Sequence, residues 1–167
     1  MYNESKSLII RMIHEEEYPL METFLYEALH VPPQHERFVF ETIFQPEIYM
    51  YIENFGKEDD LCFVAELDST VVGMAFSRIL CQNELKGYGN IDEFTPELAI
   101  SVLPDFRNKG IGTKLLNVLH NALCERGYFG ISLSVQKTNH AYSLYERLGY
   151  KVIKESQTDF VMLKTLF

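Results

Sequence analysis

The sequence predicts a single α/β domain that spans residues 1–167. Its length is typical of one domain, and 47% of the residues are hydrophobic, which is enough for a sizeable core. Some segments repeat apolar residues at helical spacing, and others are short runs of branched and aromatic residues typical of strands. In the second half these segments alternate as strand, helix, strand, helix, strand, which is the pattern of a parallel crossover.

The first half begins with a strand and continues with helical segments and a hairpin. Pro32 and Pro33 end the first helix, because proline cannot continue a helical hydrogen-bond ladder. Turn residues at 68–70 separate two apolar runs and predict an antiparallel hairpin. The expected elements are a strand at 8–13, helical segments at 16–29, 38–44 and 46–55, and strands at 61–67 and 71–77.

The second half begins with a polar loop at 81–96, and long loops in compact domains are often functional. Gly127 and Gly149 are suited to end the two helices that follow. The expected elements are a strand at 97–103, a helix at 112–126, a strand at 131–135, a helix at 139–148, and terminal strands at 150–153 and 160–163.

Composition excludes several classes of function. A formal net charge of −9 argues against a nucleic-acid partner and is compatible with a cationic small molecule. No apolar run is long enough to span a membrane, and charges interrupt the first 25 residues, so we expect a cytoplasmic protein. The three cysteines form no C-x-x-C pair and the five histidines show no ligand spacing, so we predict no metal site.

A glycine-rich segment lies between the strand at 97–103 and the long helix. It reads Arg107-Asn108-Lys109-Gly110-Ile111-Gly112-Thr113. A helix N-terminus offers unpaired N–H groups and a partial positive charge, glycines let a ligand approach the backbone, and two cations add formal charge. The segment therefore predicts a pyrophosphate site, although a strand-to-helix turn with a solvated charge pair would show the same pattern. Neither a Walker loop nor a dinucleotide fingerprint is present.

Two signatures resemble the GCN5-related N-acetyltransferase (GNAT) family. The run E-L-A-I-S-V-L-P-D-F-R-N-K-G-I-G-T resembles its strand, [QR]-x-x-G-x-[GA] loop and helix. The run S-L-S-V-Q-K-T-N-H-A-Y-S-L-Y-E-R-L-G-Y resembles its next strand, Asn and L-Y-x-x-x-G-[FY] helix. Together they cover residues 97–153, and other stretches resemble an uncharacterised bacterial subgroup. The resemblance implies a GNAT fold, with a mixed sheet of six to seven strands, a splay between the fourth and fifth strands, and helices on both faces.

The resemblance also implies that acetyl-CoA is the co-substrate. Its pantetheine arm would pair with backbone groups in the splay, and its pyrophosphate would contact the N–H groups of residues 108–113. Asn139 has a second interpretation, as an ordinary N-cap, and both can hold. The expected cofactor-binding residues are Ile100, Val102, Leu103, Arg107, Asn108, Lys109, Gly110, Ile111, Gly112, Thr113, Asn139, Tyr142 and Tyr145.

Tyr145 is the expected general acid. Acyl transfer from a thioester expels a thiolate, whose conjugate acid has a pKa of ~8.5, and a positioned phenol can protonate it. Helical pattern alone favours a core tyrosine with a satisfied hydroxyl, and the match to L-Y-E-R-L-G-Y reverses that preference. Tyr142, one turn earlier, is the less favoured substitute.

Glu97 is the expected base, acting directly or through water on the acceptor amine. The competing interpretation is a solvated carboxylate at the end of a strand. A backbone N–H near Val102 would meet the oxyanion. Glu84, Asp92, Glu93 and Glu97 suggest a cationic acceptor, although a solvated acidic loop would have the same composition.

The sequence thus predicts direct transfer of an acetyl group to a primary amine of a small molecule or a peptide, by a monomer or homodimer. Two alternatives stay open. One is a non-catalytic acyl-CoA sensor with the same fold, and the other is a nucleotide-phosphate binder of another class.

Overall fold

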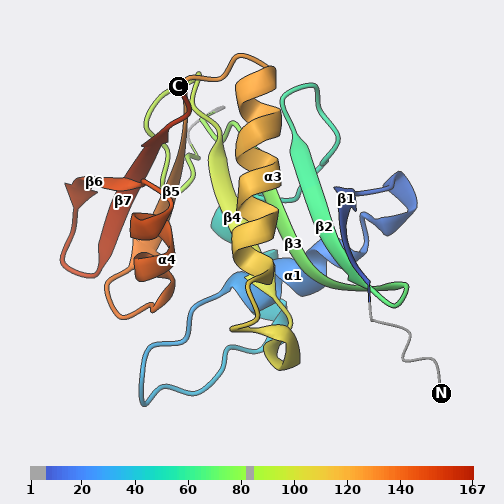
Figure 1. The fold of residues 1–167 in the computed structure, drawn as a ribbon. Helices are drawn as coiled ribbons and strands as arrows, with labels where there is room; N and C mark the ends of the chain where they lie inside the picture. Colours follow the sequence, from blue (N-terminus) through green and yellow to red (C-terminus); the bar gives the residue numbers. More distant parts are fainter. Residues whose placement is uncertain (1–6, 82–84) are drawn as a thin grey trace.

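A mixed sheet of seven strands, with helices on both faces, forms the frame of the protein (Figure 1). The computed structural model describes residues 7–81 and 85–167. The strands are β1 (Leu8–Met12), β2 (Leu61–Leu67), β3 (Thr70–Arg78), β4 (Glu97–Val102), β5 (Gly130–Gln136), β6 (Lys151–Glu155) and β7 (Asp159–Thr165). Their order across the sheet is β1-β2-β3-β4-β5-β7-β6, and β4 and β5 are the parallel neighbours. The predicted α/β class with six to seven strands is confirmed.

The helical segments of the first half are shorter than the sequence predicts. The expected helix at 16–29 is divided by Pro19 into a 3-10 turn, η1 (Glu15–Glu17), and helix α1 (Leu20–Ala28). The next two segments are the 3-10 helix η2 (Phe40–Phe44) and the short helix α2 (Pro46–Tyr49). Pro46 separates them, because its ring suits only the first turn of a helix. None of the helices in the described ranges has the length and apolar character needed to cross a membrane.

The second half contains the 3-10 turn η3 (Pro104–Phe106) and the helices α3 (Ile111–Glu125) and α4 (Ala141–Arg147). The crossover β4–α3–β5 is parallel as predicted, but the pattern does not continue to the last strands. Instead β7 lies between β5 and β6 and is antiparallel to both. The short connection at 156–158 explains why β6 and β7 are antiparallel neighbours, because a few residues can join antiparallel strands but not parallel ones.

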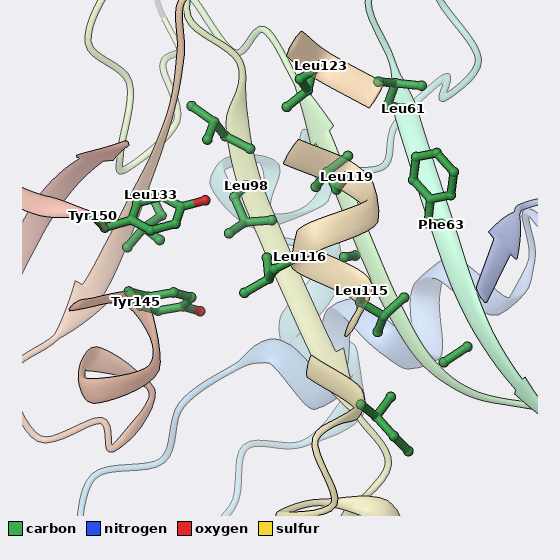
Figure 2. Close-up of a cluster of buried hydrophobic side chains, with 14 of the residues drawn as sticks. Leu61, Phe63, Leu98, Leu115, Leu116, Leu119, Leu123, Leu133, Tyr145 and Tyr150 are labelled. Atoms are coloured by element: carbon green, nitrogen blue, oxygen red, sulfur yellow. The ribbon is translucent and has the colours of Figure 1, made fainter. Parts of the chain in front are cut away.

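The core consists of two apolar clusters, one on each face of the sheet. On one face α3 packs its buried stripe against the strands, with α4 beside it (Figure 2). On the other face α1, η2 and the segment after α2 cover β2, β3 and β4. Successive β4 residues alternate between the clusters, since Leu98 joins the α3 cluster and Ala99 packs against the α1 cluster.

Candidate active site

The strands β4 and β5 diverge just beyond the start of β4 (Figure 1). In the described chain, Glu97 and Ser132 are the register partners that join these strands. The Ser132 N–H donates to the carbonyl of Pro96 at 3.0 Å. The splay predicted between the fourth and fifth strands is therefore confirmed, and it opens toward Val102 and the start of α3.

Beyond the Glu97–Ser132 pair, alternate residues of β4 direct their backbone N–H and C=O groups toward the splay. The Leu103 N–H donates to the Val72 carbonyl at 2.8 Å, so the odd-numbered residues of β4 direct their backbone groups to β3. Because these directions alternate along a strand, Ile100 and Val102 direct theirs toward β5. Leu103 does not join them, since its carbonyl accepts the N–H of Phe106 at 2.9 Å and both of its backbone groups are engaged.

The turn into α3 presents six consecutive N–H groups. Those of residues 108–113 have no hydrogen-bond partner in the part of the chain that the structure describes, and the helical ladder begins with Lys114 donating to Gly110 at 3.2 Å. Asn108 and Gly110 adopt positive φ angles of 59° and 79°, which shape the turn. An ideal Cβ at Gly110 would meet nothing within 4 Å, so this backbone borders open space. Together with the helix dipole, these donors can bind an anion.

The two cations of this segment bond to protein groups beside it. Arg107 donates from Nε to the Val102 carbonyl at 2.8 Å and from Nη2 to Glu27 on α1 at 3.1 Å. The Lys109 ammonium donates to the carbonyl of Asp105 at 3.1 Å. The side chains of Arg107 and Lys109 are thus engaged with protein groups. The backbone N–H groups of residues 108–113, in contrast, have no partner among the described residues.

At the start of α4, two further predicted residues bond within their own helix. The Asn139 side-chain oxygen accepts the N–H of Ala141 at 2.9 Å, as the N-cap interpretation expects. The Tyr142 hydroxyl donates to Glu146 at 2.9 Å, and its ring packs on Phe160. The Tyr142 hydroxyl is thus engaged with a carboxylate of its own helix, unlike that of Tyr145.

Tyr145 differs from its aromatic neighbour in what its hydroxyl contacts. Both Tyr145 and Tyr150 are buried, their rings pack edge to face at 5.6 Å, and both hydroxyls point toward β4 (Figure 2). The Tyr150 hydroxyl is hydrogen-bonded to His120 Nε2 at 2.7 Å, and burial lowers the pKa of that imidazole to about 4. The Tyr145 hydroxyl has no hydrogen bond to any described residue, and burial raises its pKa to about 12. It is therefore a protonated donor without a protein acceptor.

Glu97 is enclosed, with 2% of its surface exposed. Its Oε1 accepts the Tyr51 hydroxyl at 2.5 Å and the Gly89 N–H at 2.8 Å, whereas its buried Oε2 has no partner among the described residues. Burial raises the pKa of this carboxyl to about 7, and the two donated hydrogen bonds offset part of that rise. The alternative of a solvated strand-end carboxylate is wrong.

Glu97 and Tyr145 approach the splay from opposite faces of the sheet. Glu97 lies on the same face of β4 as Ala99, which packs against the α1 cluster, while Tyr145 belongs to the α3 cluster. A carboxylate and a phenol thus flank the same opening, one on each side. This arrangement can move one proton from a nucleophile on one face and deliver another to a leaving group on the other.

The contacts of Tyr51 and the glycines at 87 and 89 with Glu97 were not predicted. An ideal Cβ at Gly87 would lie 1.8 Å from Glu97 Oε2, and one at Gly89 would lie 2.5 Å from the backbone of Leu133. Only glycine fits at either position, because the loop passes directly over the carboxyl group. The sequence did carry a signal, the Gly87-Tyr88-Gly89 run in a long polar loop, but no pattern connects that run to Tyr51.

Of the acidic residues expected to favour a cationic acceptor, Asp92 bonds within its own loop. Asp92 accepts the N–H groups of Phe94 and Thr95 at 2.9 and 2.7 Å, so it closes its own turn. Glu84 lies outside the described residues. Across residues 7–81 and 85–167, no group of three or more His, Cys, Asp or Glu residues is placed to hold a metal ion.

Comparison with known proteins gives the same fold and motifs. A family model described as "Acetyltransferase (GNAT) domain" matches residues 58–152, which is more than half of the chain. An N-alpha-acetyltransferase of Sulfurisphaera tokodaii is 33% identical over 109 residues, and the match covers 64% of this chain and 65% of that protein. The chain therefore spans slightly less than two thirds of the length of this relative.

Two solved structures share the fold over nearly the whole chain. PaiA N-acetyltransferase from Thermoplasma acidophilum, solved with coenzyme A, has a TM-score of 0.68 at 22% identity and covers 95% of this chain and 99% of its own. YncA from Salmonella typhimurium, a putative acetyltransferase solved with acetyl-CoA, has a TM-score of 0.70 at 18% identity and covers 96% and 95%. With the splayed strands, the glycine-rich turn and the matched domain model, the chain belongs to the GNAT acetyltransferase family.

Proposed function

We propose that this protein is an acetyl-CoA-dependent N-acetyltransferase, and that its acceptor is the α-amine of a peptide or protein. One observation carries the acetyl-CoA assignment: six unpartnered N–H groups begin α3 at the open end of two splayed strands. Acetyl-CoA would supply the thioester and an anionic diphosphate. Residues 108–113 would hold the diphosphate, and the backbone of Ile100 would pair with the pantetheine arm.

Each remaining group has one task in a direct transfer. Glu97 would accept a proton from the ammonium form of the acceptor, directly or through water, which frees the nitrogen lone pair to attack the acetyl carbon. The Val102 N–H would donate to the oxygen that becomes negative in the process. The Tyr145 hydroxyl would donate its proton to the departing sulfur, whose thiol has a pKa of ~8.5. No covalent enzyme intermediate is needed.

The base favours an α-amine over a lysine side chain. The pKa of an α-amine is about 7.7–8.0, close to the value of about 7 for Glu97, whereas that of a lysine amine is ~10.4. Near the pH at which Glu97 is ionised, a large share of an α-amine is thus already free to attack, while a lysine amine is still almost entirely protonated. The N-alpha-acetyltransferase among the relatives has the same kind of acceptor in its name, which supports the proposal.

The experiment has a binding step and a turnover step. Thermal unfolding with acetyl-CoA, CoA, ATP and NAD should show a rise for the first two, since a ligand at 100 times its Kd stabilises by roughly 2.7 kcal/mol. Thiol release is then measured with a lysine-free peptide, the same peptide Nα-blocked, and an Nα-blocked lysine peptide. We expect turnover with the free α-amine alone. Stabilisation by acetyl-CoA without thiol release would instead indicate an acyl-CoA sensor, and stabilisation by ATP or NAD would contradict the assignment.

A further inference from the structure

The buried carboxyl of Glu97 is held on one oxygen only. Oε1 receives two hydrogen bonds, from the Tyr51 hydroxyl and the Gly89 N–H, and Oε2 receives none from the described residues. A carboxylate bound in this way cannot rotate freely, because rotation would break both bonds. Its basicity is also set by them, since hydrogen bonds donated to a carboxylate stabilise the charged form.

The Tyr51 hydroxyl makes two hydrogen bonds, one as acceptor and one as donor. It accepts the N–H of Tyr88 at 2.9 Å while it donates to Glu97. It therefore connects the base to the loop that contains Gly87 and Gly89. Burial and the neighbouring carboxylate raise the pKa of this phenol well above its ordinary value, which keeps the proton on Tyr51. The hydroxyl is thus a permanent donor to Glu97.

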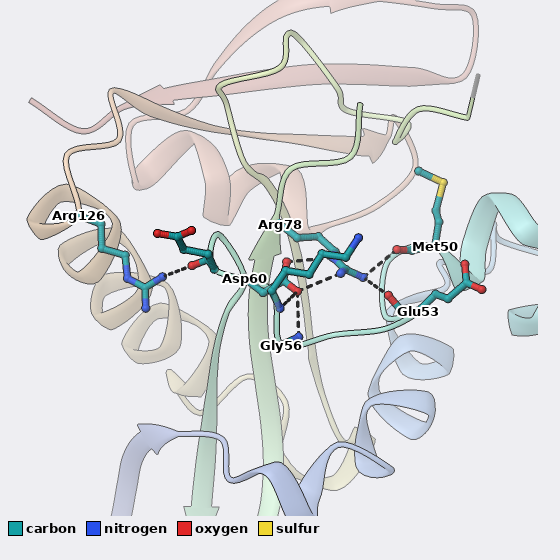
Figure 3. Close-up of polar contacts among 8 residues, drawn as sticks. Met50, Glu53, Gly56, Asp60, Arg78 and Arg126 are labelled. Atoms are coloured by element: carbon teal, nitrogen blue, oxygen red, sulfur yellow. Dashed lines mark hydrogen bonds and ion pairs between the residues drawn. The ribbon is translucent and has the colours of Figure 1, made fainter. Parts of the chain in front are cut away.

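The backbone around Tyr51 is anchored by a buried ion pair (Figure 3). Arg78 Nη1 donates to the carbonyls of Met50 and Glu53 at 3.1 and 2.8 Å, on either side of Tyr51. The same guanidinium pairs with Asp60 at 2.9 Å, and both side chains are almost completely buried. Arg78 is also the register partner of Glu97 across β3 and β4. One strand pair therefore carries the base and the anchor of the residue that holds it.

We infer that Tyr51 is the positioning residue of the base: with the Gly89 N–H it fixes Glu97 Oε1, so that Oε2 receives the proton of the acceptor nitrogen, directly or through water. In this step the N–H bond breaks, an O–H bond forms at Oε2, and the proton later passes to solvent. The inference depends on the proposed function, because it assigns a partner to the base of that reaction.

The test is the pH dependence of kcat/KM with the free α-amine peptide. The wild-type rate should fall on the acidic side with a midpoint near the Glu97 pKa of about 7. Glu97→Gln can use only the free amine, so its rate should instead follow the pKa of the substrate α-amine, about 7.7–8.0. Tyr51→Phe deletes a hydrogen bond that favours the carboxylate, so the acidic midpoint should move upward by roughly one to two pH units. Tyr49→Phe is the matched control, because its hydroxyl contacts Glu22 at 3.2 Å, and its midpoint should match that of wild type.

A second substitution gives the opposite sign. Replacing Tyr51 alone with 3-fluorotyrosine keeps the ring and makes the hydroxyl a stronger donor, so the midpoint should move downward. A uniform loss of rate in Tyr51→Phe with an unchanged midpoint, or no shift with 3-fluorotyrosine, would overturn the inference.

Carbon-13 titration of the Glu97 carboxyl in protein without substrates measures the pKa of Glu97 directly. It should show the same upward and downward shifts independently of turnover. A wild-type midpoint in kcat/KM equal to that of Glu97→Gln would count against Glu97 as the base, and so against the proposed mechanism rather than against the role of Tyr51 alone.

Discussion

Glu97 and Ser132 are directly opposite each other where β4 and β5 last pair in the described chain, and each has a buried side-chain oxygen without a partner there. Both lie on the sheet face away from α3, because their neighbours Leu98 and Leu133 belong to the α3 cluster. A buried polar atom without a partner costs about 1–3 kcal/mol. The unpartnered Glu97 Oε2 is therefore a cost to stability, and the proposed role of Glu97 as the base accounts for it.

Glu97→Gln should stabilise the protein more at pH 8 than at pH 5. The folded-state pKa of about 7 lies above the ordinary glutamate value of 4.5, so the wild type loses stability as pH rises through this window. The difference between the two pH values should be roughly 2–3 kcal/mol, from 1.36 kcal/mol per pKa unit. Urea unfolding of both proteins at each pH measures it.

Glu17→Gln provides a control of opposite sign. Hydrogen bonds from Arg11 lower the pKa of Glu17 to about 2, so its stabilising effect is present at neutral pH and is lost as pH falls. This variant should be destabilised relative to wild type at pH 8 and approach it at pH 3. If both variants changed with pH in the same direction, the enclosure of Glu97 would not be what sets its pKa.

Tyr145→Phe should lower kcat by roughly 100-fold or more while leaving the Kd for acetyl-CoA nearly unchanged, since a general acid typically contributes 10²–10⁴. Because burial raises the phenol pKa to about 12, the wild-type rate should show no loss from deprotonation of Tyr145 up to pH 10. Tyr142→Phe is the control, as that hydroxyl bonds Glu146 on the surface. Steady-state thiol release and calorimetry measure the two quantities, and equal kcat values in both variants would contradict the assignment.

Much of the fold followed from local sequence signals. Helix α3 repeats apolar residues at helical spacing, and Gly127 beyond it has the positive φ of 85° that glycine tolerates. The position of β7 between β5 and β6 could not be predicted in this way, because strand order depends on pairing between distant segments. The first helix was expected to begin at residue 16, although its apolar spacing starts only at Leu20, directly after Pro19.

The parts of the candidate site formed by neighbouring residues in the sequence could be predicted. The parts formed by contacts between distant segments could not. The turn at 107–113 is a local motif, and six of its N–H groups have no partner in the described structure. The enclosure of Glu97 depends on Tyr51, which is 46 residues away, and on a loop whose packing only the fold reveals. The spacing of Arg107 predicts a phosphate ligand. Its bond to Glu27 on α1 joins distant segments, so no local pattern could predict it.

Asp60→Asn should destabilise the protein by about 3–5 kcal/mol, because it leaves the buried Arg78 without its counter-charge. It should also weaken catalysis at neutral pH, since Arg78 anchors the carbonyls on either side of Tyr51. Glu155→Gln is the control: it removes an exposed partner of Lys137, and such pairs contribute less than about 1 kcal/mol. Urea unfolding compares the two, and equal losses would show that the Arg78 pair is not a buried anchor.

Gly110→Ala should weaken CoA binding, because its added Cβ would hinder the approach of the diphosphate to the backbone of the turn. Gly110 and Gly127 have similar φ angles, 79° and 85°, and an added Cβ would meet nothing within 4 Å at either position. An alanine at either site therefore carries the same backbone strain, of roughly 1–2 kcal/mol, without a clash in the protein. The two glycines differ in place, because Gly110 precedes α3 at the unpaired N–H groups and Gly127 follows its other end. Calorimetry with CoA should thus show at least a roughly tenfold rise in Kd for Gly110→Ala and none for Gly127→Ala, while urea unfolding shows similar losses for both. Equal Kd values would mean that the diphosphate does not contact this turn.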